Sequence, residues 1–279
     1  MLASLLIVFR EVIEAGLIVG IVLAASKGVP RRSLWITVGV AAGVIGACLV
    51  AAFAEQLSAM FAGSGQELFN ASILIVAVCM LTWHNVWMAA HGKRMAQETR
   101  QVGAEVSAGE RALTALAIVV GVAVLREGSE VVLFLYGIAA QGGTSAATML
   151  GGGLLGLAAG AGVSALIYFG LLAIPAQRVF AITSLFITLL AAGMASQAVL
   201  SLQQAGFLEF WTSTLWDTSW LLPEGGITGR LLHTLVGYSD APNGAQLVAY
   251  LATILMIVVL MRTVNGRKTV TTAVTGSAA

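Results

Sequence analysis

Two short stretches of the chain place one arginine and two glutamates at the same spacing. The first is Arg-Glu-Val-Ile-Glu at residues 10–14, and the second is Arg-Glu-Gly-Ser-Glu at residues 126–130. On an α-helix, positions i, i+1 and i+4 lie within one arc of about 100°, so each stretch presents its three charged groups on one face. Side chains three residues apart on a helix are neighbours and can contact one metal ion together. The spacing therefore predicts four metal ligands, namely Glu11, Glu14, Glu127 and Glu130.

Carboxylates in this number favour a hard cation. Hard, highly charged ions prefer oxygen ligands, whereas softer metals prefer thiolate, thioether or imidazole. The two stretches together carry a formal charge of 2 − 4 = −2, which favours cation binding without selecting its valence. We expect Arg10 and Arg126 to limit repulsion between the carboxylates when the site is empty. The alternative is that each arginine pairs with the glutamate at i+4 and only stabilises helix packing.

Other residues are weaker candidates. His84 and His91 stand seven positions apart and could form a secondary metal-contacting face, but core packing together with a histidine at the membrane edge is the favoured interpretation. Acidic residues between the apolar segments could attract cations to an entrance or dock a partner, or could be solvated loop charges. Three of them are the candidates for such a role: Asp217, Glu67 and Glu209.

Both charged stretches lie inside apolar segments, which indicates a membrane protein. Of the 279 residues, 58% are hydrophobic and 10% are charged, against roughly 25% charged in a soluble domain. An ionisable group near the bilayer centre costs at least a few kcal/mol, so it persists where it lines a cavity or pathway. Because about 20 apolar residues cross a bilayer, we predict an all-α protein with seven transmembrane helices, at 2–26, 33–54, 69–90, 113–139, 148–173, 179–201 and 246–262.

The basic residues predict how these helices are oriented. If odd-numbered helices run inward, eleven basic residues fall on one side and only Arg230 lies in the opposite loops. By the positive-inside rule, the N-terminus is outside and the polar connector 92–112 is cytoplasmic. The segment 202–245 is then a long external loop, in which aromatic residues predict one or two short interfacial helices.

The charged stretch recurs at an offset of 116 residues with three predicted helices between the copies. An odd number means that the second copy crosses the membrane in the opposite direction, as in an inverted-topology repeat. Gly39 and Gly43 also match Gly156 and Gly160 at an offset of 117. We therefore predict one permease domain, 1–279, with a three-plus-three repeat (1–91 and 113–201) and an additional seventh helix.

At the doubled motif the chain resembles the oxidase-dependent high-affinity iron permeases, and within them the bacterial elemental-type branch. Their signature is Arg-Glu-Gly-x-Glu in helices one and four. Residues 126–130 fit it fully, and residues 10–14 depart from it with Val12 in place of glycine. Similarity continues through Gln-Glu-Leu-Phe at 66–69, Thr-Ser-Leu-Phe at 183–186 and Ala-Gly-Phe at 205–207, and so covers nearly the whole chain.

This resemblance implies a function. Such permeases take up iron across the bacterial inner membrane, with iron as substrate and without a tightly bound cofactor or an enzymatic step of their own. They work with an external ferroxidase or iron-delivery protein (cupredoxin-like, peroxidase-like or a multicopper oxidase), so Fe(III) is the ion expected to pass. Two alternatives stay open: a permease for another cation such as lead or manganese, and a membrane di-iron carboxylate oxidase. The oxidase is disfavoured because the chain has no Glu-x-x-His motif.

Overall fold

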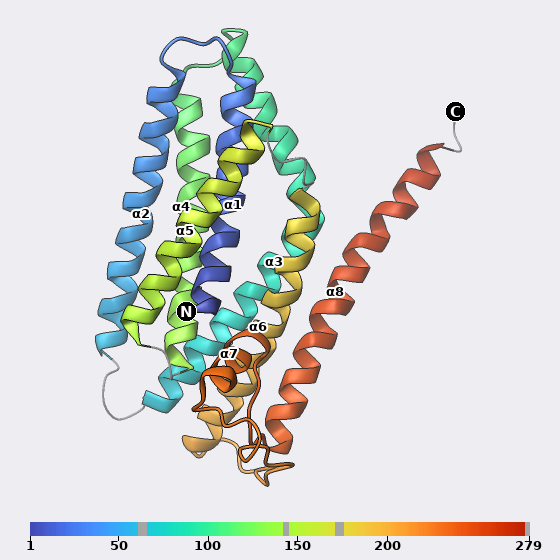
Figure 1. The fold of residues 1–279 in the computed structure, drawn as a ribbon. Coiled ribbons are helices and arrows are strands. Elements are labelled where there is room, and N and C mark those ends of the chain that lie inside the picture. Colours follow the sequence, from blue (N-terminus) through green and yellow to red (C-terminus); the bar gives the residue numbers. More distant parts are fainter. Residues whose placement is uncertain (61–65, 142–144, 171–175, 277–279) are drawn as a thin grey trace. The chain divides into compact units, whose positions relative to one another are not determined.

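The computed structural model describes residues 1–60, 66–141, 145–170 and 176–276 (Figure 1). Within these ranges the regular structure is helical, apart from one isolated β-bridge between Thr214 and Asn243. The helices are α1 (Leu2–Ala25), α2 (Arg32–Met60), α3 (Gln66–Ser107), α4 (Thr114–Ala140), α5 (Ala146–Tyr168), α6 (Ala176–Gln204), α7 (Ile227–Val236) and α8 (Gly244–Gly276).

Each of the seven apolar segments overlaps a long helix, and two of these helices extend far beyond the predicted segments. α3 continues through most of the polar connector as far as Ser107, and α8 continues to Gly276 rather than ending near residue 262. Apolarity limits how much of a helix can lie in hydrocarbon, not how far the helix continues into water. The connector 92–112 is therefore largely helical.

The segment 202–245 contains one described helix, α7, which ends where Gly237 adopts a left-handed conformation (φ +70°) and its N–H bonds to the carbonyl of His233. The aromatic residues expected on interfacial helices precede α7 instead. Phe207, Trp211 and Trp220 are all more than half exposed and lie in non-helical backbone. The prediction of a short helix was correct, but the aromatic residues are not on it.

Among the described residues, five helices are long and apolar enough to cross a membrane: Arg32–Gln56, Glu67–Gly92, Ala146–Tyr168, Ala181–Gln204 and Gly244–Val264. α1 and α4 have 24 and 27 residues, which is also sufficient length, but each carries one arginine and two glutamates near its middle. The chain is thus a helical membrane protein in which the two helices with the charged motif stand apart from the other long helices by composition.

The chain divides into two compact units. The first contains Met1–Gln66 and Arg94–Thr183, and hence α1, α2, α4 and α5 with the end of α3. In it α1 packs along α5, α2 packs along α4, and α1 also contacts α4. Figure 1 shows that α1 and α5 run in one direction while α2 and α4 run in the other.

Glycines allow the two helix pairs to pack closely. A Cβ added at Gly39 would lie 2.5 Å from the carbonyl oxygen of Ala117, and one added at Gly156 would lie 2.5 Å from that of Leu5. Both positions therefore bring backbones together more closely than a side chain permits. The pair α2/α4 and the pair α1/α5 are held by the same kind of small-residue contact.

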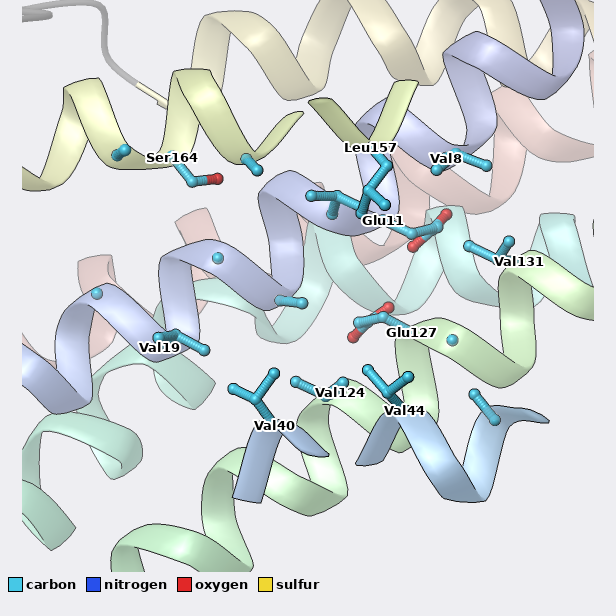
Figure 2. Close-up of a pocket in the computed structure, with 18 of the residues that line it drawn as sticks. Val8, Glu11, Val19, Val40, Val44, Val124, Glu127, Val131, Leu157 and Ser164 are labelled. Carbon is cyan, nitrogen blue, oxygen red and sulfur yellow. The ribbon is translucent and has the colours of Figure 1, made fainter. Parts of the chain in front are cut away.

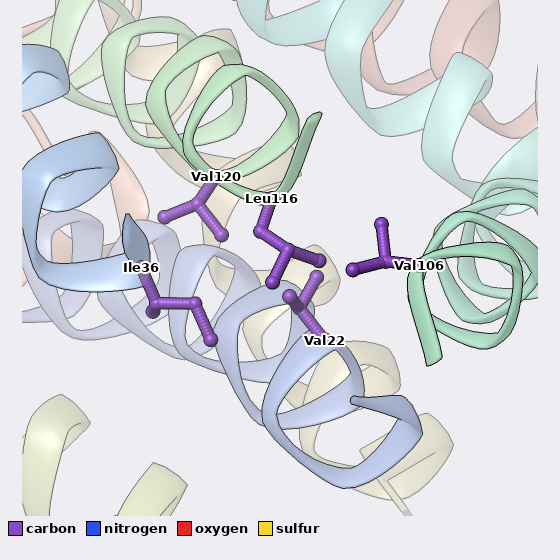
Figure 3. Close-up of a cluster of buried hydrophobic side chains, with 5 residues drawn as sticks. All are labelled: Val22, Ile36, Val106, Leu116 and Val120. Carbon is purple, nitrogen blue, oxygen red and sulfur yellow. The ribbon is translucent and has the colours of Figure 1, made fainter. Parts of the chain in front are cut away.

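One end of this unit is closed by an apolar cluster of Val22, Ile36, Val106, Leu116 and Val120 (Figure 3). These five buried side chains come from α1, α2, the end of α3 and α4. Two polar contacts reinforce the same end: the Ser107 hydroxyl donates to the carbonyl of Ala25 at 2.9 Å, and Arg32 donates to that of Leu23 at 2.8 Å. The end of the connector is thus part of the folded unit.

The second unit contains Glu67–Lys93 and Ser184–Ala279, and so most of α3 with α6, α7 and α8. Its α3 and α6 are joined by Asn85, whose Nδ2 donates to Thr188 Oγ1 at 3.3 Å and whose Oδ1 accepts from Ser184 Oγ at 2.8 Å. Interhelical hydrogen bonds of this kind hold membrane helices together where apolar packing gives little preference.

Candidate metal site

The four predicted ligands lie in the middle of α1 and α4 and are buried. The exposed fractions are 1% for Glu11, 2% for Glu14, 2% for Glu127 and 8% for Glu130. The backbone N–H and C=O groups of both helices are hydrogen-bonded within the helices. The buried charges of the carboxylates, by contrast, need partners from other side chains or from a bound ion. Burial of four carboxylates in one unit is costly without a counter-ion.

The arginines compensate part of this charge, in the same way on both helices. Arg10 Nε lies 3.0 Å from Glu14 Oε1, and Arg126 Nε lies 3.1 Å from Glu130 Oε1. The first glutamate of each motif is held less closely, with Arg10 Nη1 at 3.5 Å from Glu11 and Arg126 Nε at 4.0 Å from Glu127. The pairing at i+4 expected from the alternative interpretation is therefore present, and it leaves Glu11 and Glu127 with the weaker arginine contacts.

Three of the four carboxylates converge. Glu11, Glu127 and Glu130 each offer one oxygen, and these oxygens lie within 4.8 Å of one another. Glu14, by contrast, is not one of these converging ligands. Figure 2 shows Glu11 and Glu127 projecting into the space between their helices. Three carboxylate oxygens from two helices match the donor chemistry of a hard cation.

Glu11 and Glu127 also line a cavity of about 750 Å³ in the first unit (Figure 2). Apart from these two glutamates, its walls are formed mainly by valine, alanine and glycine residues of α1, α2, α4 and α5. Ser164 is one of the few polar residues in the wall, and its hydroxyl would lie 2.3 Å from a Cβ added at Gly16. The sequence held no signal for this cavity, because its walls belong to four separate helices.

The structure also accounts for the valine at position 12, where the signature has glycine. A Cβ added at Gly160 of α5 would lie 2.9 Å from the Cβ of Val12, so the valine fills space that the α5 glycine leaves. In the other motif the arrangement is reversed, since a Cβ added at Gly128 would lie 2.6 Å from the Cβ of Ala47 on α2. In the first contact the glycine is on α5 and the larger residue is in the charged motif. In the second contact the glycine is in the charged motif and the larger residue is on α2.

The weaker metal candidates lie in the second unit. His84 is buried in α3, whereas His91 is exposed, stacks on Trp87 with ring centroids 5.2 Å apart, and has Nδ1 3.2 Å from the carbonyl oxygen of Trp87. The stacking explains His91 without a metal.

The acidic residues proposed for an entrance or docking role, Glu67, Glu209 and Asp217, are all exposed. Asp217 Oδ1 accepts a hydrogen bond from the backbone N–H of Ser219 at 2.9 Å. Hydrogen bonds from the Ser219 side chain and backbone lower the pKa of Asp217, which therefore stays ionised well into the acidic range. Two other loop acids have structural contacts: Asp240 accepts from the N–H of Glu224, and Glu224 lies 3.0 Å from His233.

Comparison with known proteins identifies the family. The profile of the iron permease FTR1 family matches residues 1–265. The chain belongs to the iron permease FTR1 family. It is 32% identical over 256 residues to the ferrous iron permease EfeU of Yersinia pestis, covering 90% of this chain and 89% of the relative. It is 31% identical over 256 residues to EfeU of Escherichia coli O6:K15:H31 (strain 536), covering 90% and 91%. No solved structure matches the chain.

Family membership agrees with the fold. The matched region contains α1 to α7 and most of α8, so the resemblance is not confined to the charged motifs. This member of the permease family is accordingly a multi-pass membrane protein.

Proposed function

We propose that the protein moves iron across the bacterial inner membrane through a site formed by Glu11, Glu127 and Glu130, with Glu14 as a fourth, adjacent carboxylate. The observation that carries this proposal is the convergence of three buried carboxylate oxygens from α1 and α4 within 4.8 Å. Two comparisons with relatives support the proposal: the match to the FTR1 family, and the name ferrous iron permease given to the EfeU proteins.

The charge of the site suits an iron ion. The two arginines approach Glu14 and Glu130 most closely, at 3.0 and 3.1 Å, and lie farther from Glu11 and Glu127, at 3.5 and 4.0 Å. A divalent or trivalent ion there replaces its water shell with carboxylate oxygens. The formal charge of −2 does not fully neutralise a trivalent ion. Because transport requires release as well as binding, this incomplete neutralisation favours passage over permanent retention.

The proposed architecture is seven membrane-crossing helices with an external N-terminus and an inverted repeat that relates α1–α3 to α4–α6. The close contacts support the repeat: Gly39 meets Ala117 and Val120, while Gly152 meets Met1 and Ser4. Ala117 and Val120 follow Met1 and Ser4 by 116 residues, whereas Gly152 follows Gly39 by 113. The contacts therefore align Gly39 of α2 with Gly152 of α5, whereas the glycine spacing in the sequence aligns Gly39 with Gly156. The two alignments differ by four residues, which is about one helical turn.

The ion that passes is proposed to be Fe(III), produced outside the membrane by a ferroxidase or iron-delivery partner of the cupredoxin-like, peroxidase-like or multicopper oxidase kind. The permease then needs no cofactor of its own, and oxidation takes place on the partner. Exposed Asp217, Glu67 and Glu209 are the residues proposed for partner docking or cation attraction.

Uptake of radiolabelled iron into proteoliposomes tests this function. The purified chain is supplied with Fe(II) under reducing conditions, with Fe(III) as a soluble chelate, and with Fe(II) plus a ferroxidase; lead and manganese are supplied in parallel. We expect iron accumulation above that of liposomes carrying Glu127→Gln, with Fe(III) or the ferroxidase mixture giving the faster uptake. Accumulation of lead or manganese but not iron would instead identify a permease for another cation.

A further inference from the structure

The cavity beside the carboxylates is an elongated groove rather than a pocket around an ion. Its wall on α1 extends from Val8 to Leu23, with Glu11 near one end. At 1.5 Å per residue, the distance from Glu11 to Leu23 along the helix is about 18 Å. Most of the groove therefore lies beyond the reach of the carboxylates.

This long part of the groove is apolar and closed at its far end. Val19, Leu23, Val40 and Val124 line it and also pack against the apolar cluster around Val22 and Leu116. A hydrated ion would gain no polar contacts along these walls and would have to lose its water to enter. The groove is accordingly a poor route for iron.

The side of the groove is open. Val44 on α2 is 49% exposed, Leu157 on α5 is 48% exposed, and Phe169, directly after α5, is 71% exposed. In a membrane such side chains contact acyl chains, so an amphiphile can enter the groove from hydrocarbon. The volume of about 750 Å³ is within the range of small-molecule sites, about 300–1,000 Å³.

Charge selects among amphiphiles. The polar end of the groove is formed by Glu11 and Glu127, the two glutamates with the longer arginine distances of 3.5 and 4.0 Å. A cationic head group placed there gains the attraction of carboxylates that are 1% and 2% exposed, whereas an anionic head group is repelled. Hydrophobic walls with a few convergent charged groups are the usual composition of a ligand site.

We infer that this groove binds a single-chain amphiphilic cation of the alkylammonium class, with its chain along α1 and α5 and its head group at Glu11 and Glu127. Binding itself depends only on the groove and its charges. Competition between such a cation and a metal ion rests additionally on the proposed function, because both then use Glu11 and Glu127.

The test measures binding of radiolabelled dodecyltrimethylammonium to the purified chain in lipid nanodiscs without metal, with empty nanodiscs as background. Dodecyl sulfate has the same chain with an anionic head, and tetramethylammonium has a comparable cationic head without the chain; both should bind at least tenfold more weakly. Ala161→Trp, which fills the groove wall, should reduce saturable binding at least tenfold, and Ala165→Trp is the second variant if the first does not fold. Leu154→Trp, on the same helix but outside the groove lining, should bind as the unmodified chain does.

Saturable binding that is equal for dodecyl sulfate, or unchanged in both folded groove variants, would overturn the inference. Iron uptake is measured separately for Ala161→Trp and should be retained, because the apolar part of the groove is not the ion route. Loss of amphiphile binding in Glu127→Gln together with normal iron uptake would support the groove and count against the carboxylate site. Conversely, abolished uptake in Glu127→Gln without any specific amphiphile binding would leave the permease function and reject the groove ligand.

Discussion

One carboxylate oxygen of Glu11 lies within 4.8 Å of one of Glu127, although 116 residues separate them in the chain. Both are the first glutamate of their motif, and both are the less closely paired with the neighbouring arginine. Two buried negative groups at this separation repel each other unless a cation lies with them. The pair is therefore the part of the site where a bound metal has the largest electrostatic effect.

Replacing either of these glutamates by glutamine should weaken metal binding by at least tenfold and abolish most uptake, because each loses a charged ligand in a low-dielectric site. Glu130→Gln should also weaken binding because it removes the third converging ligand. Glu14→Gln should weaken binding because it leaves the charge of Arg10 uncompensated beside the remaining carboxylates. Calorimetric titration of the metal and proteoliposome uptake measure these effects. Glu110→Gln, at an exposed residue between α3 and α4, is the control for a lost charge elsewhere. Normal titrations in all four site variants would exclude a carboxylate metal site.

The two arginines should differ in their contribution to stability. Arg10 is 3% exposed and Arg126 is 31% exposed, although their distances to the glutamate at i+4 are nearly equal. Removing one partner of a buried ion pair costs about 3–5 kcal/mol, whereas a partly exposed pair is weakened by solvent screening. Arg10→Gln should therefore lower the thermal stability in detergent more than Arg126→Gln, and Arg10→Lys should restore part of the loss. Equal melting temperatures for the two glutamine variants would contradict the assignment.

The contact between Val12 and Gly160 should behave as a matched pair. Gly160→Ala alone places a Cβ 2.9 Å from that of Val12, so α1 and α5 must separate and uptake should fall. In the double variant Val12→Gly with Gly160→Ala, the clash with the Val12 side chain is removed but the added Cβ still lies 2.9 Å from the carbonyl oxygen of Phe9. Stability should therefore exceed that of Gly160→Ala without reaching that of the unmodified chain. Gly162→Ala is the control on the same helix, because an added Cβ there has no heavy atom within 4 Å. A double variant less stable than both single variants would show that the two residues are not coupled in this way.

Asp217 should not produce a pH dependence in the neutral range. Its pKa is lowered by hydrogen bonds from Ser219, so the stabilisation of this turn is present above the unfolded value of about 3.9 and is lost only as the pH falls through the lower folded value. If Asp217 attracts iron or docks the partner, Asp217→Asn should raise the iron concentration for half-maximal uptake by a similar factor at pH 5, 6.5 and 8. Uptake curves with the ferroxidase partner present measure this. An unchanged dose response would classify Asp217 as a solvated turn residue.

The proposed topology can be checked by cysteine labelling in a background with Cys48 and Cys79 replaced by alanine. Ser107 lies at the end of α3, and Ser239 lies between α7 and α8. We expect an impermeant maleimide to label Ser239→Cys in intact spheroplasts and to label Ser107→Cys only after permeabilisation. Labelling of Ser107→Cys from outside would reverse the proposed orientation.

Much of the helical structure follows from local sequence. Seven apolar segments are sufficient to predict seven long helices, because apolar length and helix formation coincide in the membrane-spanning parts. The extents of α3 and α8 could not be predicted in this way, since their polar ends continue the same helices beyond the apolar residues. The aromatic residues before α7 were misplaced on helices because amphipathic composition is compatible with both helical and irregular interfacial backbone.

The sequence by itself determined that Arg10, Glu11 and Glu14 share one face of a helix, and that a second helix repeats this face. Helix periodicity is local and requires no knowledge of neighbours. Only the tertiary structure decided that Glu11, Glu127 and Glu130 converge while Glu14 pairs with Arg10. The same is true of the groove and of Gly160 beside Val12, because both depend on how α1, α2, α4 and α5 pack. That packing is set by close contacts between residues far apart in the chain, such as Gly39 with Ala117 and Gly156 with Leu5, which no local pattern records.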